Sequence, residues 1–389
     1  MRNGVIGLRK TRWAAALVCP ALLLFYVGAY TSNATASVRA APSISSLSAV
    51  VYEPQSGLVL YEKDARTARP MASTTKLMTA LLAVENLVPN STVTVPSAAV
   101  PVEGTQIGLK AGDSITVRDL LAGLLLESGN DTANALALLM DDSLPSFARR
   151  MNHRALELGM TDSVFVTPSG LDKDGHSASA RDMALLGAAV LRQPLLAELC
   201  ASQTATISVS GSQLTVHNHN KLLRLYDGTI GLKTGFTKKS GRCLVSAVER
   251  DGVTLIVATL NGGDYWNDHI ALYDYAFTLV HRERLPDVAP SACAVMGGEA
   301  STVAIKADEI PSCVLKNGET VTAAVELPRR LWAPIRVGQE IGRVRYTAGD
   351  RELAVVSLRA AETVGERALP PWHVLLWRSF CTLGDTLLQ

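Results

Sequence analysis

The sequence predicts an α+β domain, followed by a small all-β domain and a C-terminal helix. In residues 43–284, strand patterns stand at both ends and Ala- and Leu-rich helical patterns lie between them. This order favours α+β architecture over βαβ repeats, which would alternate the two. From residue 286 to residue 368 the pattern changes to short alternating segments separated by Gly, Pro, Asn or Asp, which is typical of a small all-β, sandwich-like domain.

The composition indicates a folded protein without a strongly charged partner. The 389 residues carry 37 Lys and Arg against 36 Asp and Glu, a formal net charge of +1. This balance produces no net attraction to nucleic acid, and we expect no nucleic-acid partner. Hydrophobic residues make up 48% and charged residues 19%, which excludes disorder across the chain.

The first 36 residues have the parts of an export signal. Basic residues precede position 13, an uncharged apolar run covers 13–30, and Ala34 and Ala36 have the spacing of a small-residue cleavage site. We therefore predict a signal peptide over residues 1–36. The apolar run is also long enough for a marginal membrane span, so a retained anchor is the alternative. Both outcomes predict that the rest of the chain works outside the cytoplasm.

Each predicted element rests on a local pattern. Apolar residues recur at helical spacing in residues 70–86, 117–126, 131–140 and 181–191. Strand patterns cover residues 48–60, 230–236, 244–249 and 253–260. Asp251-Gly252 predicts a hairpin turn between the last two of these strands. In the second domain the predicted strands are 302–306, 313–315, 320–325, 336–346 and 353–358.

Residues 370–389 predict an amphipathic helix that begins at two prolines. At 100° per residue, the apolar side chains fall on one broad arc with Trp372, Leu376 and Phe380 as anchors, and polar residues fall opposite. Aromatic anchors of this kind are typical of helices at a membrane interface. We predict membrane contact through this helix. A terminal helix docked on the protein itself is the alternative.

Cysteine and histidine usage indicates neither a disulfide scaffold nor a metal site. The chain has six cysteines, too few for a scaffold, and no C-x-x-C. Cys200 and Cys243 lie in apolar segments and are expected to be buried, whereas Cys293 and Cys313 could form a bridge. The H-x-H pair at 217–219 lacks an identifiable third ligand. We expect no metal and no cofactor.

Two further histidines and a polar loop are weaker candidates for a functional role. We interpret His153 and His176 as surface or capping residues. Asp172 and Asp174 share a polar loop with His176, and this loop could line a cleft.

The first chemical motif is Ser73-Thr74-Thr75-Lys76, at the start of a predicted helix. Positions i and i+3 share a helix face, so the Ser73 hydroxyl and the Lys76 amine can lie side by side. A serine is a poor nucleophile without a base, and an amine that is buried or placed near other cations can accept its proton. The four-residue motif alone is weak, because many helices contain it by chance.

Two further triplets follow in order. Ser128-Gly129-Asn130 lies at the junction of two predicted helices, and Lys233-Thr234-Gly235 lies within a predicted strand. The glycine after the threonine lets a ligand backbone approach the strand edge. S-x-x-K, S-x-N and K-T-G in this order form a set found in serine enzymes that react with β-lactams.

These motifs and their flanks closely resemble the serine D-alanyl-D-alanine carboxypeptidases, the low-molecular-mass penicillin-binding proteins. The resemblance covers roughly Ser46 to Arg284, continues more weakly to the C-terminus, and is similar in organisation to the Gram-positive sporulating branch. It implies a penicillin-binding, β-lactamase-like serine transpeptidase domain, with an antiparallel sheet and a helical cluster. The matching segments are Met71–Ala80, Leu125–Asp131, Thr167–Leu171 and Gly231–Phe236.

The resemblance implies a role for each motif residue. Ser73 would attack the carbonyl between two D-alanines and form an acyl-enzyme, with Lys76 as its general base. Ser128 would relay a proton to the leaving amine, helped by Lys233. Asn130 would hold the substrate amide and help to position Lys76.

The K-T-G strand would bind the substrate's terminus. By the same resemblance, Thr234 would bind the terminal carboxylate with Lys233, and Gly235 would allow close approach. The backbone N–H groups of Ser73 and Phe236 would form the oxyanion hole.

Two departures from the family pattern affect this terminus. Some relatives place an arginine some thirty residues after K-T-G, but residues 262–268 here contain no basic residue. We therefore expect carboxylate binding to depend on Thr234 and Lys233. Phe236 also stands where polar residues are common, which could alter rate or substrate preference.

The resemblance implies a serine-type D-Ala-D-Ala carboxypeptidase that removes the terminal D-alanine from peptidoglycan pentapeptides, is acylated by β-lactams, and acts at the outer face of the cytoplasmic membrane or in the cell wall. A β-lactamase, a peptidoglycan DD-endopeptidase and an inactive penicillin-binding scaffold protein are the alternatives. A β-lactamase needs a deacylating glutamate. Glu157 and Glu198 are the glutamates between Asn130 and Lys233, and neither has family-like flanks.

Overall fold

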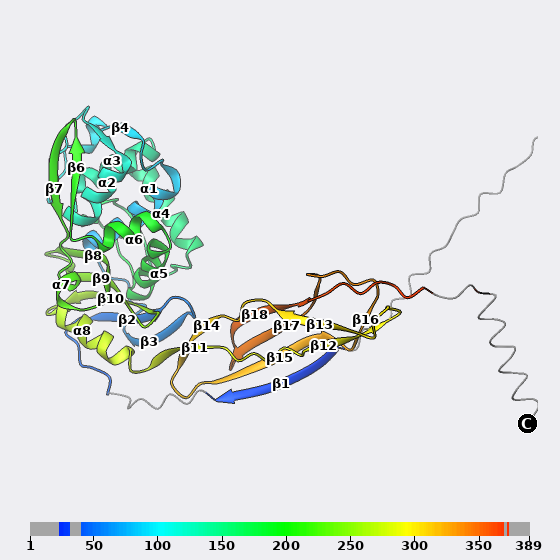
Figure 1. Ribbon diagram of the computed structural model, residues 1–389. Coiled ribbons are helices and arrows are strands. Elements are labelled where there is room, and N and C mark those ends of the chain that lie inside the picture. Colours follow the sequence, from blue (N-terminus) through cyan, green and yellow to red (C-terminus); the bar gives the residue numbers. More distant parts are fainter. Residues whose placement is uncertain (1–22, 32–39, 369–371, 373–389) are drawn as a thin grey trace, which may run out of the picture. The chain divides into compact units, whose positions relative to one another are not determined.

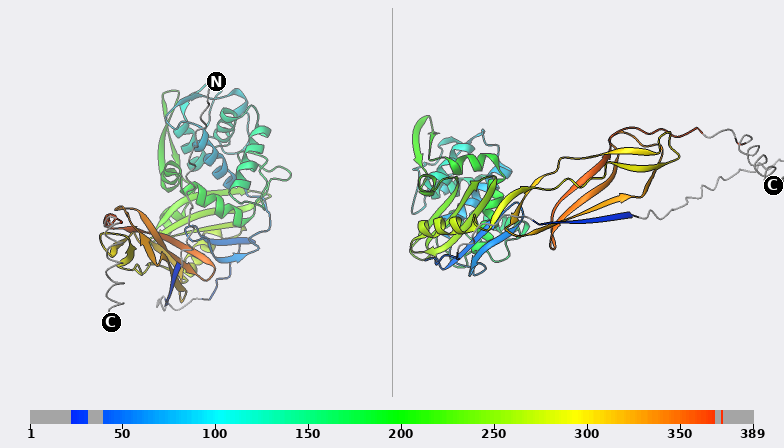
Figure 2. Two further views of the ribbon diagram at one scale, coloured as in Figure 1. Left: turned by 90° about the vertical axis from the view of Figure 1, so that its right-hand side faces the viewer. Right: turned by 60° about the horizontal axis from the view of Figure 1, so that its bottom comes forward.

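The computed structural model describes residues 23–31, 40–368 and 372. The described chain forms two compact units. One comprises the described residues up to Glu283 from position 40, together with Ser312–Glu319. The other comprises Leu23–Thr31, Arg284–Pro311 and the described residues from Thr320 onward. Figures 1 and 2 show the two units from three directions.

The first unit is built on an antiparallel sheet of five strands in the order β3-β2-β10-β9-β8. Residues Asp251 and Gly252 both have positive φ, as the predicted hairpin between β9 and β10 requires. The α+β prediction is confirmed. The strands are β2 (Ser48–Glu53), β3 (Leu58–Lys63), β8 (Thr229–Thr237), β9 (Gly241–Arg250) and β10 (Val253–Gly262).

Both faces of this sheet are buried. Val245 and Ile256 pack into the helical core, whereas Val248 and Leu255 pack against the helix α8 (Tyr265–Ala276) on the opposite face. Alternate residues of one strand point to opposite faces, so the strands are apolar almost throughout. Figure 1 shows α5 and α8 on the two sides of the sheet.

The helical cluster lies between β3 and β8 in the sequence. Its longer helices are α1 (Lys76–Asn86), α2 (Val117–Ala122), α3 (Asn130–Met140), α4 (Leu144–Glu157), α5 (Ala180–Leu191) and α6 (Pro194–Ala201). Its short turns are η1 (Ala72–Thr75), η2 (Ser97–Ala99), η3 (Gly123–Glu127) and α7 (Leu222–Leu225). A small sheet borders it, with β4 (Thr92–Thr94), β5 (Ser114–Thr116), β6 (Thr204–Val209) and β7 (Ser212–His217).

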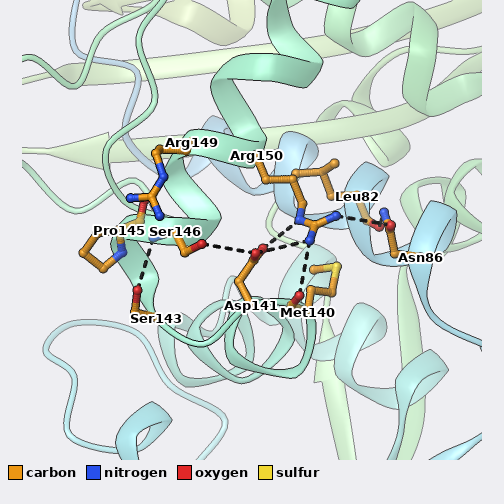
Figure 3. A network of polar contacts seen from close by, with 9 residues as sticks. All are labelled: Leu82, Asn86, Met140, Asp141, Ser143, Pro145, Ser146, Arg149 and Arg150. Atoms are coloured by element: carbon orange, nitrogen blue, oxygen red, sulfur yellow. Dashed lines mark hydrogen bonds and ion pairs between the residues drawn. The ribbon is translucent and has the colours of Figure 1, made fainter.

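Helix α4 is an addition to the predicted elements, because its sequence is largely polar and only a narrow stripe, including Phe147 and Met151, is buried. A polar network joins it to its neighbours (Figure 3). The Arg150 guanidinium donates to both carboxylate oxygens of Asp141, at 2.7 and 3.2 Å, and to the Met140 carbonyl. This bidentate pair ties α4 to the end of α3.

Strand β14 (Ser312–Lys316) differs from its expected place. It pairs with β11 (Val280–Arg284) in a two-stranded sheet, and is grouped with the first unit rather than with the rest of residues 286–368. The physical reason is burial, because Val314 packs into the same core as Val280 and Leu272.

The second unit is all-β, as predicted. Its sheet has seven strands in the order β1-β15-β17-β18-β13-β12-β16. The strands are β1 (Leu23–Thr31), β12 (Ala292–Met296), β13 (Thr302–Ala307), β15 (Thr320–Pro328), β16 (Arg330–Trp332), β17 (Glu340–Ala348) and β18 (Arg351–Ala360).

Two terminal predictions involve this unit. Residues Leu23–Thr31, inside the predicted signal peptide, pair antiparallel with β15 along its edge. The leader over 1–36 stays a prediction, since strand pairing in the full-length chain does not report processing. The predicted helix over 370–389 lies outside the described residues except for Trp372, which is exposed.

The remaining expectations concern cysteines and membrane spans. Cys200 and Cys243 are buried, as predicted. Cys293 is a free thiol whose Sγ lies 3.3 Å from the Pro328 carbonyl oxygen, so the bridge to Cys313 does not form. Within the described ranges no single helix is long and apolar enough to cross a membrane, and the bent pair α5 and α6 passes by length and composition alone.

Candidate active site

Ser73 lies in the short turn η1 that leads into α1. The residue before it, Ala72, has φ of +47°, a conformation that non-glycine residues rarely adopt. Two threonine hydroxyls hold the turn, Thr74 donating to the Met71 carbonyl at 2.6 Å and Thr75 to the Ala72 carbonyl at 2.7 Å. The turn therefore holds a strained backbone at the predicted nucleophile, which the surrounding contacts must enforce.

Lys76 is fully buried and meets three oxygen atoms. Its Nζ lies 2.9 Å from Ser73 Oγ, 2.7 Å from Asn130 Oδ1 and 2.7 Å from the carbonyl oxygen of Ser169. The amide oxygen and the carbonyl can only accept hydrogen bonds. In the neutral amine they take both N–H groups, and the lone pair is left facing the Ser73 hydroxyl.

The electrostatic surroundings favour this neutral amine. Burial, and secondly the positive charge of Lys233, hold the pKa of Lys76 well below its ordinary value, and Asp131 opposes them. A lysine whose pKa is lowered in this way loses its proton more readily and can act as a general base. Geometry and pKa thus agree on the same assignment.

Ser128 and Asn130 lie where the helix pair is interrupted. The π-helical turn η3 ends at Glu127. Ser128 follows it with a left-handed φ of +69°, which turns the chain before α3 begins at Asn130. Asn130 uses both ends of its amide, since Oδ1 accepts from Lys76 and Nδ2 donates to the Glu103 carbonyl at 2.7 Å. Asn130 of the S-x-N motif therefore contacts Lys76 of the S-x-x-K motif directly.

Asp131 is a supporting residue that the sequence interpretation missed. Its buried carboxylate accepts backbone N–H bonds from Ile107, Gly108 and Leu109, at 3.0 to 3.2 Å. It thereby holds the loop that carries Glu103 against Asn130. In the sequence it appeared only as the last residue of the family-like segment Leu125–Asp131, with no role assigned, because an aspartate after S-x-N has no local pattern of its own.

The K-T-G strand lies against the nucleophile turn. A Cβ placed on Gly235 would come within 2.9 Å of the Met71 carbonyl oxygen and of the Ser73 backbone nitrogen. Only glycine permits this approach. It brings the backbone of β8 at Gly235 next to the backbone nitrogen of Ser73.

Lys233 is a buried residue of this strand, and its Nζ donates to the Thr234 carbonyl at 3.2 Å. Burial lowers the pKa of Lys233 to about 8, although Cys200 and Glu127 favour its charged form. Phe236 differs, because its side chain is 64% exposed. Lys233 can therefore supply a proton or a positive charge, whereas Phe236 contributes through its backbone.

His176 is not the surface or capping residue that we expected. It is buried, its Nδ1 accepts from the Val166 N–H at 2.9 Å, and its Nε2 lies 2.8 Å from Thr75 Oγ1. Burial lowers its pKa to about 4, so the ring is neutral. His176 therefore ties the loop that carries Ser169 to the nucleophile turn. His153, by contrast, is exposed as predicted.

The polar loop around this histidine also meets the end of the K-T-G strand. Thr237 Oγ1 donates to Asp172 at 3.0 Å, and Lys239 pairs with Asp174 at 3.9 Å. The expectation that the loop lines the site is consistent with these contacts.

A cavity of about 560 Å³ adjoins the catalytic side chains. Two of its lining residues, Ser169 and Glu103, supply the backbone carbonyls that accept from Lys76 and Asn130. Val102, Pro168 and Leu171 contribute apolar walls. The cavity thus borders the two loops whose carbonyls hold Lys76 and Asn130.

The H-x-H pair lies near Lys233 rather than in a metal cluster. His219 is 3.7 Å from the Glu127 carboxylate, and the backbone N–H of His217 donates to the same group. Within the part of the chain that the structure describes, no group of three or more His, Cys, Asp or Glu side chains could hold a metal ion.

Comparison with known proteins extends these observations. Residues 34–263 match the family described as D-alanyl-D-alanine carboxypeptidase, and residues 288–366 match the C-terminal domain of penicillin-binding protein 5. The carboxypeptidase DacB2 of Mycobacterium tuberculosis is 39% identical over 59% of this chain and 81% of its own length. DacF of Bacillus subtilis is 29% identical over 81% of this chain and 85% of its own.

Solved structures agree. A crystal structure of a D-alanyl-D-alanine carboxypeptidase from Mycobacterium tuberculosis superposes with a TM-score of 0.60 at 35% identity, covering 62% of this chain and 94% of that one. D-alanyl-D-alanine endopeptidases are also similar, one from Pseudomonas aeruginosa being 33% identical over 55% of this chain and 71% of its own length. The family match spans more than half of the 389 residues and includes all three motifs. The chain is a member of the D-alanyl-D-alanine carboxypeptidase family, with a family-type β domain after the catalytic one.

Proposed function

We propose that the protein is a serine-type D-Ala-D-Ala carboxypeptidase that removes the terminal D-alanine from peptidoglycan pentapeptides by way of a Ser73 acyl-enzyme. The observation that carries this proposal is the environment of Lys76. Its N–H groups have fixed acceptors in Asn130 and Ser169, and its lone pair faces Ser73 Oγ.

Acylation begins with proton transfer from Ser73 Oγ to Lys76 Nζ. The oxygen attacks the carbonyl carbon between the two D-alanines, and the carbonyl oxygen takes the negative charge between the N–H groups of Ser73 and Phe236. Donors fixed there in advance stabilise charge that appears only in the transition state. The close approach of Gly235 to Ser73 supports this pairing of donors.

The C–N bond then breaks and the leaving amine needs a proton. Ser128 relays it from Lys76. Lys233 on β8, whose pKa burial lowers to about 8, assists this transfer. Free D-alanine departs and the shortened peptide remains as an ester on Ser73. Water adds to this ester, Lys76 accepts its proton, and the free serine is restored.

The two sides of the site suit the two ends of the substrate. The terminal D-alanine lies along β8, where Lys233, Thr234 and Gly235 bind it. The preceding residues of the stem peptide extend past Asn130 toward the cavity lined by Val102 and Leu171. A β-lactam resembles the same dipeptide, so we expect penicillins to acylate Ser73.

We further propose that the chain is exported by its 1–36 leader and held at the outer face of the cytoplasmic membrane by residues 370–389. Family membership supports work on peptidoglycan outside the cytoplasm. Truncation after Pro370 tests the helix: the shortened protein should move from the membrane fraction to the supernatant, and unchanged partitioning would contradict the anchor.

Labelled penicillin tests the catalytic assignment. Purified protein should take up one equivalent of label on Ser73, and Ser73→Ala should take up none. Equal labelling of both proteins would contradict the proposal. A long-lived adduct would distinguish this protein from a β-lactamase, which hydrolyses its adduct quickly. We expect a long-lived adduct, because the candidate deacylating residues Glu157 and Glu198 form ion pairs with Arg154 and Arg118.

An endopeptidase is the second candidate, since endopeptidases are among the similar proteins. Release of free D-alanine from a pentapeptide favours the carboxypeptidase. Cleavage of cross-linked peptides without release of D-alanine favours the endopeptidase. An inactive scaffold would do neither.

A further inference from the structure

We infer that Arg242 binds the carboxylate of the substrate's terminal D-alanine, together with Thr234. This assignment depends on the proposed function for the identity of the substrate. It revises the expectation that carboxylate recognition depends on Thr234 and Lys233, because the described structure brings a second cationic side chain, that of Arg242, to the same end of the strand.

Arg242 lies near the start of β9, the strand that pairs with the K-T-G strand β8 on one side and with β10 on the other. In the sheet register its Cα is paired with Phe236 on β8 and with Gly262 on β10. Residues 262–268, which contain no basic side chain, therefore lie beside an arginine that comes from the adjacent strand.

Alternation places Arg242 on the same face of the sheet as Thr234. Thr234 and Phe236 are two residues apart on β8 and share a face, and their partners on β9 are Leu244 and Arg242. Thr234 and Arg242 are thus diagonal neighbours, with Cα atoms roughly 7–8 Å apart. An arginine side chain spans that distance.

Two aromatic rings hold the guanidinium. Its central carbon is 5.9 Å from the centroid of the Phe236 ring and 6.0 Å from that of Tyr265. Such contacts orient a guanidinium plane while leaving N–H groups free to form a bidentate pair with a carboxylate. The exposed Phe236 ring, unexplained by its backbone role, thereby gains a function as a support for Arg242.

The charge of Arg242 is available to a ligand. The side chain is exposed and forms no ion pair among the described residues, whereas Arg118, Arg150 and Arg154 all pair with carboxylates. Lys233, the other cation at this strand, is buried and donates to the Thr234 carbonyl. Arg242 is therefore an exposed cation on the strand next to Thr234, without an ion-pair partner among the described residues.

Binding to inactive protein tests this inference without requiring turnover. In the Ser73→Ala background we compare an acyl-D-alanyl-D-alanine peptide with its C-terminal amide, by calorimetry. Arg242→Gln should weaken binding of the acid about 10- to 100-fold, as expected for loss of a charge-assisted hydrogen bond, and change binding of the amide less than twofold. Arg242→Lys should retain part of the preference, and Arg149→Gln, an exposed arginine on α4, is the matched control.

The outcomes separate the two proposals. Equal weakening of the acid and the amide would overturn the inference, because it would mean that Arg242 only shapes the site around Phe236. A preference for the acid that is unchanged in Arg242→Gln would also overturn it. Failure of the wild-type protein to release D-alanine would contradict the proposed function, while a preference for the acid that is lost in Arg242→Gln would still support the carboxylate site.

Discussion

Gly235→Ala tests how closely the K-T-G strand must approach the nucleophile. The added methyl carbon would lie 2.9 Å from both the Met71 carbonyl oxygen and the Ser73 nitrogen, and 3.0 Å from the Thr74 nitrogen. All three are backbone atoms of η1 and its flank, so none can rotate away. Ordinary contact begins near 3.4 Å, and the strand and the turn must therefore separate by about 0.5 Å.

The expected loss of acylation rate follows from the effect of this separation on the proposed oxyanion hole. In the proposed oxyanion hole, the N–H group of Ser73 on the turn and that of Phe236 on the strand must converge on one oxygen. Loss of one oxyanion donor costs on the order of 10²–10³ in rate, and a misplacement of about 1 Å costs about 10². We expect the second-order rate constant for penicillin acylation to fall about 10- to 100-fold, and stability to fall by about 1–3 kcal/mol.

Stopped-flow acylation with a fluorescent penicillin and thermal unfolding measure the two effects. Gly263→Ala is the control, because its added carbon would lie 3.6 Å from its nearest neighbours in Ser45, an ordinary contact. Acylation of Gly235→Ala at the wild-type rate would show that the close approach of this strand to the turn is not needed for catalysis. An equal loss in Gly263→Ala would show that the effect is not specific to the oxyanion hole.

Three further predictions concern the titratable groups. Lys233→Gln removes a positive charge that lowers the pKa of Lys76, so the acidic limb of the acylation pH profile should move to higher pH, and an unmoved limb would contradict the coupling. His176→Asn should slow acylation about tenfold by loosening the loop that carries Ser169, without moving that limb, and unchanged acylation would argue against the positioning role. The buried His269, whose pKa burial lowers to about 3, stays neutral in the folded protein while the unfolded chain binds a proton below about pH 6.5. Stability should therefore fall as pH drops from about 6.5 toward 3, by up to about 1.4 kcal/mol per pH unit for this group, and chemical denaturation of His269→Gln should show a shallower dependence.

The sequence was sufficient for the catalytic motifs because each is local. Ser73 and Lys76 share one turn and the start of a helix, and the strand pattern around K-T-G is clear. That the three motifs form one site was predicted from the resemblance of their flanking segments to the family. The described structure brings Lys76, Asn130 and Gly235 to one place.

The supporting residues could not be predicted, because their roles depend on contacts distant in sequence. His176 acts on Thr75 across 101 residues, and Asp131 acts on a loop 22 to 24 residues before it. Arg242 is adjacent to Phe236 only through the register of two strands. No local spacing contains that information.

The boundary between the two units also could not be predicted exactly, because it too depends on contacts between residues that are distant in the sequence. The alternating pattern of residues 312–316 predicts a strand, which is present, but alternation does not specify its partner. Burial of Val314 with Val280 assigns that strand to the first unit.

Release of D-alanine from a peptidoglycan pentapeptide, by wild-type protein and by Ser73→Ala, tests the central claim most directly. We expect stoichiometric D-alanine and a tetrapeptide from the wild-type protein, and neither product from the variant. Intact pentapeptide after prolonged incubation with wild-type protein, or equal release by Ser73→Ala, would contradict it.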